Sequence, residues 1–163
     1  MPQWQLKHKS GEFYPSEVIH MNLSDAQSLH QAGWEENFDW TRYLRSNESS
    51  TPYKLLVIGN NNYIQGAIAY HVREHCVFVD LLESAPLNRY KTKDRDFSNV
   101  TDVLLGEACV QSFAHGKQGE VAFIPKSNLY SYYKTRFGAR YGGMRQMYLT
   151  SVEAIRLIRL YYK

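Results

Sequence analysis

Hydrophobic positions follow a helical period most clearly between residues 104 and 113, which read Leu-Leu-Gly-Glu-Ala-Cys-Val-Gln-Ser-Phe. Apolar or small side chains recur there as adjacent pairs four residues apart, and this spacing predicts one buried helix face. Glycines at 116 and 119 are expected to end the helix, and the apolar run 120–124 predicts a short strand. A second helix is expected from Lys126 to Gly138, with an apolar face formed by Leu129, Tyr132, Tyr133 and Phe137.

The first half of the chain has the pattern of strands separated by polar turns. A strand is expected within residues 12–21, a helix from Ser24 to about Gly33, a short helix over 39–45 and a loop over 46–52. Three consecutive strands are then predicted at 53–58, 64–73 and 76–82. The Gly-Asn-Asn-Asn sequence at 59–62 predicts a hairpin turn between the first two.

The remaining segments complete a mixed architecture. Residues 84–99 are expected to form a polar loop, and short strands are expected around Gly142 and Gly143. Thr150 and Glu153 form a capping-box pattern for a last helix that runs to about Tyr162. The order of elements predicts a mixed α/β fold, a single domain over 1–163 in which helices flank one central, mostly antiparallel sheet.

Composition narrows the class of protein. A chain of 163 residues can bury one sizeable core, and 44% hydrophobic with 21% charged residues is typical of a globular domain. A net charge of +3 is too small to predict a nucleic-acid partner, so none is expected on charge alone. Cys76 and Cys109 lie in apolar runs and are expected to be reduced core thiols. No signal core or membrane-spanning run of ~20 apolar residues is found, so a cytoplasmic protein is expected.

The order of helix, glycine, strand, Tyr-bearing helix and glycine resembles the C-terminal half of the GNAT acyltransferase superfamily, over residues 53–150. Tyr133 precedes Phe137-Gly138-Ala139, which is similar to the family's Tyr-x-x-x-Gly-Phe ending, with the glycine one residue later and Ala139 in place of Phe. The resemblance implies a GNAT-like fold, acetyl-CoA as co-substrate, and a Tyr133 hydroxyl that protonates the departing thiolate of CoA. A phenol suits this role because it donates a hydrogen bond while neutral at pH 7. The alternative is that Tyr132 and Tyr133 are simply aromatic core.

The end of the third predicted strand carries two carboxylates, Asp80 and Glu83. In the family this strand diverges from its neighbour, so the resemblance implies that the backbone around Leu81 and Leu82 pairs with the pantetheine arm of CoA. It also implies that Glu83 or Asp80 deprotonates the acceptor amine, directly or through water, which contributes on the order of 10²–10⁴ in rate. Strand alternation places Asp80 and Leu82 on one face, with Leu81 and Glu83 on the other.

The stretch before the long helix departs from the family. The family's pyrophosphate loop is rich in glycine, whereas the matching residues 96–101 contain none. The backbone amides of Asn99, Val100, Thr101 and Asp102 are the expected pyrophosphate ligands, because a helix N-terminus attracts anions. Asn99 is also expected to cap the helix, and Asp102 to add negative charge in its first turn, so both compete with a phosphate for these amides. Four basic residues of the preceding loop could supply charge: Arg89, Lys91, Lys93 and Arg95.

Two other patterns in the sequence point to different chemistry. His71-Val-Arg-Glu74-His75 fits a His-x-x-Glu-His zinc motif, but that chemistry needs both histidines on one helical turn. The flanking segments have the pattern of strands, so a hairpin end is expected and no metal. Basic residues also share one face of the last helix, Arg156, Arg159 and Lys163, which suits a solvated stripe better than an RNA site.

The sequence therefore predicts an N-acetyltransferase that moves an acetyl group from acetyl-CoA to an amine acceptor in a ternary complex. The alternative is a GNAT-like domain that has lost CoA binding and serves as an interaction module. The acceptor class stays open among small molecules, proteins and aminoacyl-tRNA, and a homodimer is one option. No membrane partner is expected.

Overall fold

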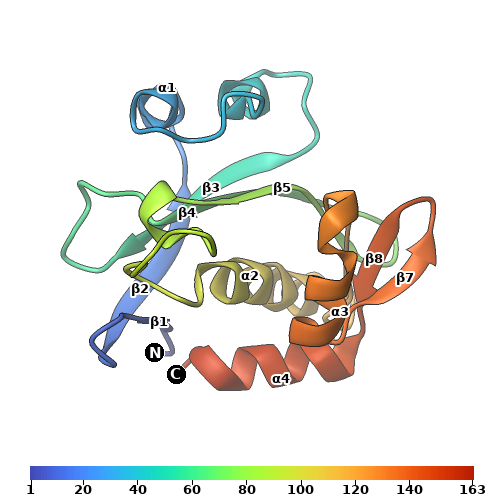
Figure 1. Cartoon of the computed structure of the whole chain (residues 1–163). Coiled ribbons are helices and arrows are strands. Elements are labelled where there is room, and N and C mark those ends of the chain that lie inside the picture. Colours follow the sequence, from blue (N-terminus) through green and yellow to red (C-terminus); the bar gives the residue numbers. More distant parts are fainter.

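The computed structural model describes residues 1–163 and consists of one curved sheet with helices on both faces (Figure 1). The strands are β1 (Trp4–Lys7), β2 (Phe13–His20), β3 (Thr51–Val57), β4 (Gly66–Val72), β5 (Val77–Ser84), β6 (Val121–Phe123), β7 (Arg140–Gly143) and β8 (Gln146–Leu149). The helices are α1 (Leu23–Gln31), α2 (Val100–Ala114), α3 (Tyr130–Phe137) and α4 (Ser151–Tyr161). Three short 3₁₀ helices complete the chain: η1 (Trp40–Leu44), η2 (Pro86–Asn88) and η3 (Ser127–Leu129).

The sheet has eight strands in the order β1-β2-β3-β4-β5-β6-β8-β7. Every neighbouring pair is antiparallel except β5 and β6, which run parallel and are connected through α2. A parallel pair requires such a crossover, because the chain must return to the end where the first strand began. The expected mixed α/β fold with one mostly antiparallel sheet is confirmed.

Two hydrophobic cores hold the helices against the sheet. The larger contains 22 buried residues, including Leu104, Leu105 and Leu157, and lies between the sheet and helices α2 and α4. The smaller contains nine buried residues, including Leu29 and Trp40, and lies on the opposite face under α1 and η1. The two faces of β5 are therefore both covered, which fits its run of apolar residues. No helix combines the length and apolar character needed to cross a membrane.

Strand β1 is an element that the sequence analysis missed. Its four residues pair with β2, and Trp4 packs directly on α2 at Gly106. A Cβ atom at Gly106 would lie 2.4 Å from Cη2 of Trp4, so only glycine permits this contact without movement. The strand is too short to show a period, and only the long-range packing of Trp4 identifies it.

Element boundaries differ from expectation in two places. Helix α1 is capped by Asn22 rather than Ser24: Asn22 Oδ1 accepts from Asp25 N at 2.8 Å, and Asp25 accepts from Asn22 N at 3.0 Å. Helix α3 begins at Tyr130 rather than Lys126, because the intervening residues form the separate turn η3. Of the two cysteines, Cys109 is buried as expected, whereas Cys76 is only partly buried.

Candidate active site

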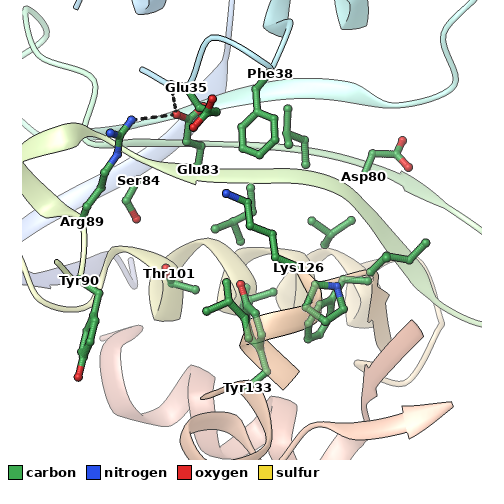
Figure 2. Close-up of a pocket in the computed structure, with 18 residues that line it drawn as sticks. Glu35, Phe38, Asp80, Glu83, Ser84, Arg89, Tyr90, Thr101, Lys126 and Tyr133 are labelled. Carbon is green, nitrogen blue, oxygen red and sulfur yellow. Dashed lines mark hydrogen bonds and ion pairs between the residues drawn. The ribbon is translucent and has the colours of Figure 1, made fainter. Parts of the chain in front are cut away.

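The site begins where two neighbouring strands diverge. Strands β5 and β6 pair from Val77 with Val121 to Val79 with Phe123, and there β6 ends while β5 continues to Ser84. A slot with a volume of about 360 Å³ opens along the unpaired part of β5 (Figure 2). The start of α2 and the Tyr133 side chain of α3 approach the slot from one side of β5, and Glu35 and Phe38 from the other.

The β6-facing edge of β5 is free over residues 80–84. Its opposite edge pairs with β4 as far as Ser84 with Gly66. Leu81 and Leu82, the predicted pantetheine contacts, both line the slot. Backbone groups on such an edge can pair with an extended amide-bearing ligand as a further strand would.

A β-bulge at Asp80 changes the direction of the side chains along β5. Ala69 of β4 pairs with Leu81, but Tyr70 pairs with Val79, so Asp80 is an extra residue in β5. The predicted alternation holds for Leu82, which packs toward the α2 core, and for Leu81 and Glu83, which face the α1 core. It is wrong for Asp80, which lies on the side of Glu83 (Figure 2). The bulge also coincides with the point where β6 leaves β5.

Asp80 lines the slot and belongs to a hydrogen-bonded cluster. Ser50, buried just before β3, donates its hydroxyl to Oδ2 of Asp80. His71 of β4 places Nδ1 2.7 Å from Ser50 Oγ and 3.3 Å from Asp80 Oδ2. The other oxygen of Asp80 forms no hydrogen bond within the protein, so the carboxylate is fixed by one oxygen and free at the other.

Glu83 is held more completely than Asp80. Its Oε2 accepts from the backbone N–H of Glu35 at 2.7 Å and from Arg89 Nη2 at 3.4 Å, and its Oε1 accepts from Trp40 Nε1 at 2.8 Å. The side chain is 6% exposed, so these donors compensate the carboxylate for lost hydration. Glu83 therefore joins β5 to the α1–η1 segment, and its role as a base stays a prediction.

Tyr133 points into the slot from α3 (Figure 2). Its ring packs against Phe123 at 4.9 Å and Phe137 at 5.8 Å between ring centroids. Burial raises the pKa of the phenol to about 12, so the hydroxyl stays protonated at neutral pH. The hydroxyl forms no hydrogen bond within the protein, whereas the neighbouring Tyr132 does not line the slot. Tyr133 is thus a neutral donor without an acceptor.

The N-terminus of α2 carries a set of unsatisfied donors. The first intrahelical donor is Val103, whose N–H bonds to Asn99 O, and the amides of the four preceding residues have no acceptor in the protein: Asn99, Val100, Thr101 and Asp102. Three of these residues are buried, and Thr101 lines the slot. A helix start without side-chain acceptors is completed by water or by an anionic ligand.

The expected cap by Asn99 is wrong, whereas Asp102 lies in the first turn of the helix as expected. Asn99 occupies the cap position but makes no capping bond, because its amide accepts from Lys7 N at 2.8 Å and donates to Gln5 O at 2.9 Å. Asp102 instead receives two N–H groups of Arg136. Burial raises the pKa of the Asp102 carboxyl, and the Arg136 guanidinium opposes part of that shift.

The loop over residues 84–99 carries four basic residues but brings less positive charge to the slot than that number predicts. Arg89 lines the slot but is paired with Glu83. Arg95 lies 5.4 Å from the ring of Tyr90, which also lines the slot. Lys126, which the sequence analysis did not select, extends from the segment after β6 and places Nζ 5.3 Å from the ring centroid of Phe38.

The His-x-x-Glu-His motif lies at the β4–β5 hairpin, as expected from its flanking strands. His71 is the sixth residue of β4, whereas Glu74 and His75 lie in the turn that follows. His75 is 85% exposed, and His71 is turned toward Ser50 and Asp80. The two histidines are therefore not arranged as successive ligands on one helical turn.

Comparisons with solved structures agree with this geometry. No known family profile matches the chain, and no curated protein matches it in sequence. A protein from Desulfovibrio desulfuricans, assigned as an acetyltransferase of the GNAT family, superposes with a TM-score of 0.60 at 11% identity, covering 83% of this chain and 99% of that one. A chimera of the spermidine N-acetyltransferase SpeG from Vibrio cholerae with hSSAT gives 0.60 at 12% identity, covering 86% and 98%. AtaTR bound with AcCoA gives 0.55 at 11% identity, covering 88% and 98%.

These similarities extend over most of each chain at a sequence identity of only 11–12%. They confirm the predicted resemblance at the level of the fold. The chain has the fold of the GNAT acetyltransferases.

Proposed function

We propose that the protein transfers an acyl group, most simply acetyl, from a CoA thioester to an amine acceptor, with both substrates bound at once. One observation carries the proposal. The unpaired edge of β5, the free amides at the start of α2 and the unpartnered hydroxyl of Tyr133 all belong to one continuous site. An elongated ligand with amides, a pyrophosphate and a thioester uses all three.

The N-terminus of α2 is the proposed binding site for the pyrophosphate of CoA. The N–H groups of residues 99–102 have no acceptor, and the one carboxylate in the first turn is paired with Arg136. The site therefore offers donors and the positive end of the helix dipole without a competing cap. The absence of glycine is compatible with this role, because the amides have no acceptor in the protein although no glycine precedes them.

Two side chains are placed for the proton transfers of this reaction. When bound, acetyl-CoA supplies an acetyl group activated as a thioester. We assign Asp80 as the group that accepts the proton an ammonium must lose before its nitrogen forms the new C–N bond. The Tyr133 hydroxyl donates a proton to the sulfur as the C–S bond breaks. The nitrogen loses its second proton to solvent as the amide forms, and the phenol is reprotonated from solvent. Asp80 suits the first role better than Glu83 because one of its oxygens is free.

The proposal is tested at Thr101, which lines the slot in the first turn of α2. Thr101→Glu places a negative charge among the free amides, where the helix dipole favours it, so the fold should be kept or stabilised. Thr101→Gln is the neutral control of the same length. Saturation at ~100 times the Kd stabilises a protein by about 2.7 kcal/mol, which corresponds to about 5–10 °C in Tm for a chain of this size.

Acetyl-CoA should raise the Tm of the wild type and of Thr101→Gln by this amount, and that of Thr101→Glu much less. Equal shifts in all three proteins would show that the pyrophosphate does not bind at α2. No shift in the wild type at millimolar acetyl-CoA, with no heat of binding in calorimetry, would overturn the enzyme proposal. The interaction-module hypothesis would then lead.

A further inference from the structure

A cluster of hydrogen-bonded polar side chains lies beside the slot and has no role in the reaction as proposed so far. It joins residues from three places in the chain: Ser50 before β3, His71 in β4 and Asp80 at the β5 bulge. A fourth member, Arg73, donates Nε–H to His71 Nε2 at 3.1 Å. Ser50 is buried and the side chains of His71 and Asp80 are 18% and 27% exposed, whereas Arg73 lies at the surface, so the cluster runs from the surface to a partly buried carboxylate.

Arg73 determines the tautomer of His71. A guanidinium can only donate, so Nε2 of His71 must be the unprotonated, accepting nitrogen. In the neutral ring the proton is then on Nδ1, which faces Ser50 Oγ. The guanidinium of Arg73 is itself held over the Phe78 ring, 3.7 Å from its centroid.

Hydrogen bonds therefore run in one direction through the cluster. Arg73 donates to His71, His71 donates through Nδ1 to Ser50, and Ser50 donates its hydroxyl to Oδ2 of Asp80. The two middle members, His71 and Ser50, each accept one bond and donate the next, and successive hydrogen bonds of this kind polarise one another. The chain ends on one oxygen of Asp80 and leaves the other free.

We propose that Ser50 and His71 are positioning residues for the proposed reaction: they fix the Asp80 carboxylate so that its free oxygen serves as the base for the acceptor amine. The bulge makes this necessary. It adds Asp80 as an unpaired residue, so the ladder with β4 does not fix its orientation. This inference rests on the acyltransferase function and assigns His71, a member of the apparent zinc motif, to proton transfer without metal.

Three further polar side chains lie near the cluster. Tyr43 of η1 is close enough to Asp80 for the carboxylate to contribute to the raised pKa of that phenol, after burial as the main cause. His115 and Gln111 of α2 share a small cavity with His71. None of these three forms a hydrogen bond with His71 or Asp80. Within the cluster, Nδ1 of His71 also lies 3.3 Å from Oδ2 of Asp80, so it faces the carboxylate directly as well as through Ser50.

The test compares His71→Asn, His71→Gln and His71→Ala in the full-length protein. The Asn amide can place an N–H where Nδ1 lies, whereas the Gln amide reaches the position of Nε2. The assay measures the release of free CoA from acetyl-CoA with spermidine as the probe amine. If the protein does not accept spermidine, the assay follows hydrolysis, with water as the acceptor. We expect kcat to fall about tenfold in His71→Ala and His71→Gln, to be near wild type in His71→Asn, and the KM for acetyl-CoA to be unchanged in all three.

A double-mutant cycle with Asp80→Asn separates positioning from folding. Asp80→Asn alone should lower kcat by about 10²-fold. In that background His71→Ala should have no further effect, because the group that it orients is gone. Additive losses, or equal activity of His71→Asn and His71→Ala, would show that His71 is only structural and would overturn the inference.

A readout without turnover comes from the imidazole nitrogens. ¹⁵N NMR of the wild type should show His71 as the Nδ1–H tautomer, and Ser50→Ala should change that signal while acetyl-CoA still raises the Tm. An Nε2–H tautomer would contradict the hydrogen-bond chain. It would overturn this inference and leave the proposed function standing. A wild type that neither binds acetyl-CoA nor releases CoA overturns the proposed function, and this inference falls with it.

Discussion

Tyr133→Phe isolates one hydroxyl group in the slot. The hydroxyl has no hydrogen-bond partner in the protein, and the ring contacts with Phe123 and Phe137 do not involve it. Removing it should therefore change the free energy of unfolding by no more than about 0.5 kcal/mol. If Tyr133 protonates the leaving thiolate, kcat should fall by about 10²-fold, which is ~2.7 kcal/mol of transition-state stabilisation. The KM for acetyl-CoA should change little, because the interaction forms only as the bond breaks.

The matched control is Tyr132→Phe. Tyr132 is on the same helix, 5.2 Å from Tyr133 between ring centroids, but does not line the slot. Its substitution should leave kcat within about twofold, well below the 10²-fold that loss of a general acid brings. Both variants are compared with wild type by the release of free CoA and by thermal unfolding. Equal effects of the two substitutions, or a loss in Tyr133→Phe confined to KM, would refute a catalytic role for the Tyr133 hydroxyl.

Three further predictions concern packing, titration and metal. Gly106→Ala should lower the free energy of unfolding by about 1–3 kcal/mol, because its Cβ would meet Trp4; an unchanged chemical-denaturation midpoint would contradict this. Burial raises the folded-state pKa of Asp102 above 3.8, so its contribution to stability is complete below that pH and is lost as the pH rises through the folded pKa. The stability of the wild type relative to Asp102→Asn should therefore decrease from acid to neutral pH, and an increase would mean that Arg136 outweighs burial. Glu74→Gln and a strong chelator should each leave the Tm and CoA release unchanged; stoichiometric zinc in the purified protein, lost in His71→Ala, would overturn this.

The elements with a clear period were predictable from sequence. The paired apolar positions of 104–113 fix the buried face of α2, and the alternating segments give β3, β4 and β5 to within a few residues. The slot could be placed at the end of β5 only through the resemblance, which related Tyr133 to that strand. Strand β1 could not be predicted, because its stability comes from contacts with residues about 100 positions away, as in the 2.7 Å bond from Trp4 Nε1 to Glu107.

The polar contacts around the slot were harder to predict from the sequence than the secondary structure. Ser50 and His71 meet Asp80 through pairing of separate strands, and no local spacing relates them. The sequence carried no signal for the bulge, because β5 is covered on both faces and its consecutive apolar residues are expected without one. Arg136 is 34 residues from Asp102, so its neutralising role at the start of α2 depends on the docking of α3. Local patterns therefore predicted the framework, and long-range packing decides which polar groups are free.

Native mass spectrometry of the purified protein with acetyl-CoA tests the central claim most directly. The account predicts a one-to-one complex, either already present as co-purified CoA or formed on addition of acetyl-CoA, and a marked loss of that complex in Thr101→Glu but not in Thr101→Gln. A spectrum that contains only the unliganded chain at millimolar acetyl-CoA would contradict the assignment of the slot between β5 and β6 as a CoA site.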